Sequence, residues 1–141
     1  MGKVPDLRNE VVELLWERMN RMCPNVTCVA GCGYGGAPLV SVMGSAYDIE
    51  NCVIRDAPKR DGSLIEGQDL SRNDRLVIID DVLTTGKSLA DARQAIEQTG
   101  ANVLGYLVIV DRGEYDRNIF DPDRSDIPLG YLYTPKDFGL K

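Results

Sequence analysis

Apolar and polar positions along the chain follow two kinds of spacing. Residues 11–22 repeat apolar side chains at helical spacing with charged residues between them, which predicts an amphipathic helix. We expect a second helix over 38–47, with Pro38 near its first turn, and a third over 88–98, which Gly100 ends. Short apolar runs typical of strands occupy residues 26–30, 53–54, 75–79, 103–110 and 129–133.

This order of elements predicts an α/β domain. The inner strand runs are apolar at nearly every position, which is typical of strands buried on both faces of a parallel sheet. We therefore predict one domain, residues 1–141, with a doubly wound parallel sheet flanked by helices. Ligands of such sheets bind at the carboxyl ends of the strands. Three segments follow predicted strands and form the candidate site: residues 31–36, residues 55–67 of a long loop over 55–71, and residues 80–88.

Composition and charge narrow the class of protein. The chain has 141 residues, of which 43% are hydrophobic and 27% charged, and its net charge is -6. No apolar run approaches the roughly 20 residues of a membrane span, and the first residues lack the apolar core of a signal peptide. An acidic chain without a basic patch argues against nucleic-acid binding. We expect a cytoplasmic protein that binds neither membranes nor nucleic acids.

The chain has four cysteines and no histidine. None of the cysteines has CxxC spacing, which argues against a zinc site, and we expect reduced thiols in the core. The absence of histidine excludes Ser-His and Cys-His catalysis. Acid–base chemistry would fall to carboxylates, lysine, tyrosine or the substrate. The cysteines are Cys23, Cys28, Cys32 and Cys52.

The glycine-rich segment 31–36 fits three interpretations. Gly31, Gly33 and Gly36 have the GxGxxG spacing of a dinucleotide-binding turn. The acid that usually follows about 20 residues later would be Asp56, which lies in the predicted loop and not at a strand end. A structural turn and another kind of phosphate or pyrophosphate loop are the alternatives. In all three, glycine allows backbone N–H groups to approach an anion closely.

The segment IIDDVLTTGKS, residues 78–88, is the most informative in the chain. Asp80 and Asp81 end an apolar strand, and a small, hydroxyl-rich turn follows before a helix. A Walker A motif is excluded, because Asp81 stands where that motif needs its first glycine. The turn consists of Thr84, Thr85, Gly86, Lys87 and Ser88.

Hydroxyls and N–H groups at the start of a helix form a cup for a phosphate monoester. Two adjacent carboxylates before the cup can accept hydrogen bonds from vicinal hydroxyls, or help to hold a divalent cation. The segment therefore predicts a site for a ribose 5-phosphate group. The alternative is a capped helix after an acidic turn, which leaves the two carboxylates without a purpose.

The same segment resembles the phosphoribosyl pyrophosphate (PRPP) motif of type I phosphoribosyltransferases. That motif has four apolar residues, two acids, two more apolar residues and Thr-Thr-Gly-x-Ser. Further segments resemble orotate phosphoribosyltransferases, and the resemblance extends from about residue 5 to 138. These segments are PDLR (5–8), YGGAPL (34–39), LIEG (64–67), VIVDRGE (108–114) and LGYLYTPKDF (129–138).

The resemblance implies a type I phosphoribosyltransferase fold with a reduced N-terminal hood, and a homodimer. It also implies transfer of the 5-phosphoribosyl group from PRPP, with Mg²⁺ as cofactor, to a nucleobase. Orotate is the favoured base, giving orotidine 5'-monophosphate and pyrophosphate in pyrimidine synthesis. In this family the protein positions the reactants and stabilises charge on the leaving group, so a chain without histidine can still serve.

Roles for individual residues follow from the same resemblance. Asp80 and Asp81 would hold the ribose hydroxyls, and the turn from Thr84 to Ser88 would hold the 5-phosphate. Mg²⁺ would arrive with PRPP and not be held by the protein alone, with Asp80 and Asp81 as its candidate protein ligands. The pyrophosphate would face Gly33, Tyr34 and Gly35. Positive charge would come from Arg55, Lys59 and Arg60, with Lys59 acting across the dimer interface. The residues near the base would be Arg112 and Thr84.

Three features depart from the family pattern. Asp56 and Asp61 stand where the family has a lysine and a histidine, and Gly35 stands where a lysine is frequent. Only about thirty residues precede the glycine-rich segment, too few for the usual hood. A carboxylate beside a pyrophosphate is repulsive. A phosphoribosyltransferase for another base, or a regulatory protein that binds PRPP or a nucleotide without turnover, are therefore the alternatives. A dehydrogenase leaves residues 80–88 unexplained.

Overall fold

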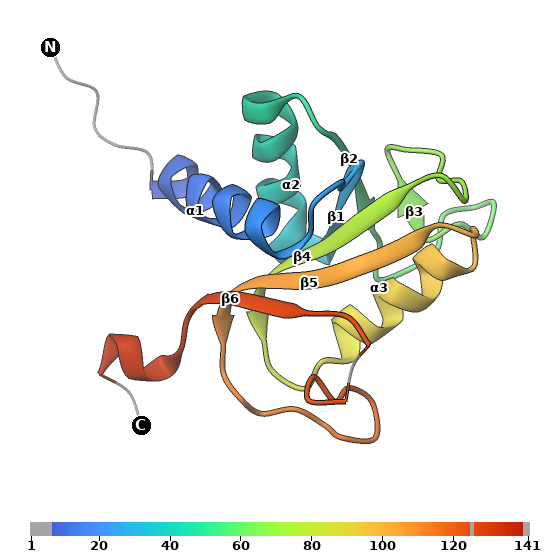
Figure 1. Cartoon of the computed structure of the whole chain (residues 1–141). Helices are drawn as coiled ribbons and strands as arrows, with labels where there is room; N and C mark the ends of the chain where they lie inside the picture. The colour runs from blue at the N-terminus through green and yellow to red at the C-terminus, as the bar shows by residue number, and fades with distance from the viewer. Residues whose placement is uncertain (1–6, 125, 140–141) are drawn as a thin grey trace, which may run out of the picture.

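The computed structural model describes residues 7–124 and 126–139, and it shows a sheet with helices on both faces (Figure 1). The helices are α1 (Leu7–Met22), α2 (Gly33–Tyr47), α3 (Lys87–Glu97) and a short 3₁₀ helix, η1 (Pro135–Phe138). The strands are β1 (Cys28–Cys32), β2 (Glu50–Ile54), β3 (Ile65–Glu66), β4 (Arg75–Leu83), β5 (Asn102–Asp111) and β6 (Leu129–Tyr133).

The sheet has six strands in the order β3-β2-β1-β4-β5-β6. Every pair from β2 to β6 is parallel, whereas β3 pairs with β2 in the antiparallel direction. The predicted α/β fold is confirmed, and the prediction of a parallel sheet is wrong only for β3. The link between β2 and β3, residues 55–64, is a hairpin, which is too short for the crossover that a parallel pair requires.

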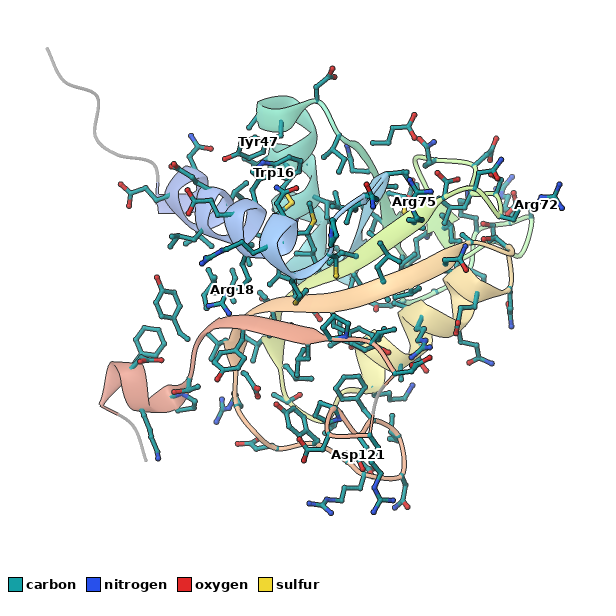
Figure 2. The ribbon with its side chains drawn as sticks, viewed as in Figure 1. Trp16, Arg18, Tyr47, Arg72, Arg75 and Asp121 are labelled. Atoms are coloured by element: carbon teal, nitrogen blue, oxygen red, sulfur yellow. The ribbon has the colours of Figure 1, made fainter. Side chains whose placement is uncertain are left out.

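Each face of the sheet carries its own apolar core, because successive side chains of a strand point to opposite faces. α1 and α2 cover one face, where Leu15 and Met43 pack with Val77 and Ile79 of β4. Trp16 of α1 stacks on Tyr47 at the end of α2, with ring centroids 4.3 Å apart (Figure 2). This contact joins the two helices on the outer side of the sheet.

The opposite face packs against α3 and the segment between β5 and β6. Leu89 and Ile96 of α3 lie against Ile78 of β4, and Phe120 from the segment after β5 joins the same core. All four cysteines are buried free thiols, as predicted. Within the described residues, none of the helices has the length and apolar character needed to cross a membrane.

Three features near the candidate site differ from the sequence prediction. β4 continues through both acids to Leu83, because it stays paired with β5 as far as Leu83 and Asp111. The glycine-rich turn is absent, because β1 ends at Cys32 and α2 begins at Gly33. The predicted loop over 55–71 contains β3 and a hairpin closed by the N–H of Arg55, which donates to the carbonyl of Leu64 at 2.7 Å.

Candidate active site

Three strand ends meet at one edge of the sheet. β1, β2 and β4 are neighbours and parallel, so their carboxyl ends lie on the same side, where α2 and α3 begin (Figure 1). Crevices at this edge are where open α/β sheets bind their ligands. The sequence-predicted residues of the glycine-rich segment, the acid pair and the hydroxyl-rich turn all lie at this edge.

The close approach of α2 to β4 depends on small residues. A β-carbon on Gly36 would lie 2.3 Å from the carbonyl oxygen of Ile79, and one on Gly31 would lie 2.5 Å from the carbonyl oxygen of Gly36. Both distances are far below van der Waals contact, so only glycine permits this packing. The structure therefore shows a packing role for Gly31 and Gly36, which hold the N-terminus of α2 against the sheet, and none of the three interpretations of GxGxxG stated this role.

Asp80 and Asp81 lie directly beside this first turn of α2. A β-carbon on Gly35 would lie 2.4 Å from Oδ1 of Asp81 and 2.8 Å from Oδ1 of Asp80. The N–H of Asp81 donates to Oδ1 of Asp80, and the N–H of Val82 donates to Oδ1 of Asp81, each at 2.8 Å. In this structure the two carboxylates therefore occupy the space that a side chain on Gly35 would fill.

The two carboxylates differ in burial and in protonation. Asp80 is only 9% exposed, whereas Asp81 is exposed. The pKa of Asp80 is raised to about 7, mainly by burial and also by the Asp81 carboxyl and the charge of Asp56, whereas the hydrogen bond from the Asp81 N–H lowers it. Asp80 therefore gains a proton near neutral pH unless hydroxyl donors or a cation compensate its charge.

The hydroxyl-rich turn forms the start of α3. Gly86 has φ +88° and is the N-cap residue of α3, so the start of the helix has no capping hydrogen bond from an N-cap side chain. The N–H of Lys87 donates to Oγ1 of Thr85 at 3.3 Å, while the side chains of Thr84, Thr85 and Ser88 are exposed. A hollow of about 30 Å³ is lined by residues 80 and 82–89. Unsatisfied N–H groups at this helix start suit a phosphate group.

Phe120 packs against the turn before α3, and its role at the site was not predicted from the sequence. A β-carbon on Gly86 would lie 2.3 Å from Cβ of Phe120. The Phe120 ring also packs edge-on against Tyr106, with centroids 5.0 Å apart. The only signal in the sequence is an apolar pair, Ile119 and Phe120, inside a long charged segment.

The segment after β5 is tied to the turn by backbone hydrogen bonds. The N–H of Arg112 donates to the carbonyl of Leu83 at 3.1 Å, and the N–H of Asp116 donates to the carbonyl of Thr85 at 2.9 Å. The Arg112 side chain is exposed and pairs with Glu114 at 3.4 Å. The structure therefore brings Arg112 to the rim of the candidate site.

Of the three predicted cations of the β2–β3 hairpin, the structure brings only Arg55 to the hollows beside the site. Arg55 lines two hollows beside the hairpin, where it pairs with Glu66 at 3.8 Å and its Nε donates to the carbonyl of Ala57 at 3.1 Å. Lys59 and Arg60 lie at the hairpin tip and line neither hollow.

A search of known families and structures agrees with this geometry. The model of the phosphoribosyl transferase domain matches residues 3–127. The chain belongs to this family. Orotate phosphoribosyltransferase from Pyrobaculum islandicum is 36% identical over 118 residues, covering 82% of this chain and 60% of the relative. The enzyme of the same name from Methanopyrus kandleri is 35% identical over 107 residues, covering 74% and 57%.

Solved structures of family members have the same fold. Orotate phosphoribosyltransferase of Mycobacterium tuberculosis in complex with Fe(III) dicitrate is 25% identical, with a TM-score of 0.80 over 94% of this chain and 75% of that one. A phosphoribosyltransferase from Corynebacterium diphtheriae is 25% identical, with a TM-score of 0.82 over 97% and 84%. The predicted family and the type I fold are confirmed. The chain spans only 50% to 60% of the length of the first curated relatives that it matches.

Proposed function

We propose that this chain is a phosphoribosyltransferase that transfers the 5-phosphoribosyl group of PRPP to orotate and releases pyrophosphate. The observation that carries the proposal is the placement of Asp80 and Asp81 between two helix N-termini. The first turn of α2 touches the carboxylates at Gly35, and the turn before α3 follows them along the chain. A molecule with a diol between two phosphate groups matches this arrangement.

Each part of the site would hold one part of PRPP. The Thr84–Ser88 turn would bind the 5-phosphate, and Asp80 and Asp81 would accept hydrogen bonds from the ribose hydroxyls. The N–H groups of Gly33, Tyr34 and Gly35 would then face the diphosphate on C1. Donors that stabilise a leaving anion lower the barrier to its departure. Arg55 is near enough to contribute, and Arg112 at the rim would bind the carboxylate of orotate.

The residues present fit a Mg²⁺ ion that arrives with its substrate. Within residues 7–124 and 126–139, no group of three or more His, Cys, Asp or Glu side chains is arranged to hold a metal ion. Asp80 and Asp81 offer the carboxylate oxygens that Mg²⁺ prefers, and a diphosphate would supply the others. Bound there, Mg²⁺ would neutralise part of the charge of the leaving pyrophosphate.

The names of the relatives support orotate as the base and pyrimidine synthesis as the setting. From the acidic composition we further propose a cytoplasmic reaction without nucleic-acid or membrane partners. We also propose a homodimer, in which Lys59 and Arg60 of one subunit serve the neighbouring site.

One observation favours a second candidate function. Lys59 and Arg60 line neither of the hollows beside the hairpin, as expected of a protein that binds PRPP without turnover.

The proposal is tested by titrating PRPP with Mg²⁺ into the parent protein and into the double variant Asp80→Asn, Asp81→Asn. We expect the parent to bind and the variant to lose at least about tenfold in affinity, because charged acceptors bind hydroxyls more strongly than amides do. Equal affinity of the two proteins would show that the diol does not lie on the acid pair. Binding by the parent without orotate consumption would favour the second candidate function.

A further inference from the structure

Asp56 holds an unusual place at the start of α2. It follows β2 by two residues, its side chain is exposed, and a β-carbon on Gly33 would lie 3.1 Å from each of its carboxylate oxygens. Gly33 is the first residue of α2 and has φ +49°. The carboxylate of Asp56 therefore lies against the backbone of the turn that faces an anion in the proposed function.

Carboxylates from the β2–β3 hairpin and from β4 lie against the start of α2. The first turn contains no acidic residue, and Cys32 gives it no side-chain cap. Asp56 lies against Gly33, and Asp80 and Asp81 lie against Gly35. Asp56 is also close enough to contribute to the raised pKa of Asp80. An unscreened diphosphate at this turn would therefore meet three carboxylates.

Nearby cations compensate this charge only in part, because several have carboxylate partners of their own. Arg55 pairs with Glu66 at 3.8 Å, Lys87 with Asp91 at 2.5 Å, and Arg112 with Glu114 at 3.4 Å. A pair of opposite charges presents little net field to a third group. The uncompensated charge at the start of α2 is consequently negative.

Asp56 also lies where two hollows meet. A hollow of about 510 Å³ extends from Asp56 toward α3 and is lined by Lys87 and Ser88. A second hollow, of about 480 Å³, extends toward α2 and is lined by Tyr34. Gly33, Arg55 and Asp56 line both. A ligand at the start of α2 in either hollow therefore shares that hollow with Asp56.

We infer that Asp56 makes the binding of a diphosphate group conditional on a divalent cation. The inference rests on the proposed function, since it assigns the diphosphate to the start of α2. The cation screens the diphosphate from Asp56, and without it repulsion opposes binding. The turn before α3 also has a hollow of its own, lined by residues 80 and 82–89 and not by Asp56. A ligand that carries only a 5-phosphate can bind there without meeting the Asp56 carboxylate.

The test uses calorimetric titration of inorganic pyrophosphate and, separately, of ribose 5-phosphate, each with Mg²⁺ and with a chelator. In the chelator we expect Asp56→Asn to bind pyrophosphate about tenfold more tightly than the parent, and Asp56→Lys more tightly still. With Mg²⁺ the parent and Asp56→Asn should differ by less than about threefold, and ribose 5-phosphate should bind both equally.

Asp61→Asn is the matched control, because it removes the same charge from the same hairpin. The Asp61 carboxylate accepts a hydrogen bond from the N–H of Ser63 at 2.9 Å, which an asparagine oxygen can also accept. We expect this variant to bind pyrophosphate as the parent does in both conditions. An equal gain in the Asp56 and Asp61 variants would reduce the effect to overall charge and overturn the inference.

Two further outcomes separate this inference from the proposed function. Equal Mg²⁺-free affinity for pyrophosphate in the parent and Asp56→Asn, with PRPP still bound in Mg²⁺, would overturn the inference alone. Failure of the parent to bind PRPP and ribose 5-phosphate under any condition would overturn the proposed function, and the inference with it.

Discussion

Gly35 and Gly86 are two glycines of the site whose side-chain space is occupied by side chains distant in the sequence. A β-carbon on Gly35 would overlap the carboxylates of Asp80 and Asp81, and a β-carbon on Gly86 would overlap the Phe120 side chain. The sequence indicated glycine for backbone approach to an anion, but the packing against these partners involves residues far away in the chain. Spacing alone could not predict it.

The substitution Gly86→Ala should destabilise the fold and weaken the phosphate turn. A left-handed φ costs an alanine about 1 kcal/mol, and its β-carbon would overlap Phe120, which adds about 1–3 kcal/mol. Urea unfolding and titration of ribose 5-phosphate measure the two effects. The control is Gly113→Ala, where φ is +72° and nothing lies within 4 Å of a β-carbon. Equal destabilisation by the two substitutions would contradict the contact with Phe120.

The raised pKa of Asp80 makes stability depend on pH. The folded value is about 7 and the unfolded value about 3.9, so between these values the folded protein binds more protons. The free energy of unfolding attributable to Asp80 should therefore fall as pH rises from about 4 to 7, by at most roughly 1.4 kcal/mol per pH unit. Chemical denaturation of the parent and Asp80→Asn across this range gives the difference. A difference that does not change with pH would contradict the burial of an ionisable Asp80.

At the scale of elements, the predictions succeeded where a pattern was long and failed at its ends. The helix of residues 11–22 is α1, which begins earlier at Leu7, and the strand of residues 129–133 is β6 with the predicted bounds. The acids were expected to end a strand, but pairing with β5 carries β4 through them. Charged residues and glycines indicate the ends of elements only locally. In this protein, strand pairing extends β4 past the acids, and close packing lets α2 begin within the glycine-rich segment. β3 was missed because two residues carry no pattern.

The sequence between β5 and β6 is charged and typical of turns, yet its Phe120 packs against the turn of residues 84–88. We expect Phe120→Ala to lower the free energy of unfolding by about 3–5 kcal/mol, because this side chain is 6% exposed within the core under α3. Urea denaturation checks this value. Phe138→Ala removes the same ring at a site that is 59% exposed and should cost far less. Similar losses in both variants would contradict the supporting role of Phe120.

At the scale of the whole molecule, the acid pair and the turn after it indicated both the family and the edge of the sheet that carries the site. Strand order places the ends of β1, β2 and β4 together, so residues distant in sequence become one surface. The position of Asp56 against Gly33 was not predictable, because it depends on how the hairpin folds back. The homodimer remains a prediction.

Mixing two inactive variants tests the dimer and the role of Lys59 together. Lys59→Ala leaves the acid pair intact, and Asp80→Asn leaves the hairpin intact. If Lys59 serves the neighbouring subunit, a mixed dimer has one complete site, and random exchange should restore about a quarter of the parent activity. Activity that stays at the level of the separate variants after subunit exchange would contradict action across an interface.

The most direct test is the absorbance of orotate during incubation with the parent protein, PRPP and Mg²⁺. We predict that orotate is consumed only when PRPP is present, and that the double variant Asp80→Asn, Asp81→Asn consumes it at least about a hundredfold more slowly, because positioning of the ribose is lost. Absence of PRPP-dependent orotate loss in the parent would contradict orotate transfer by this chain.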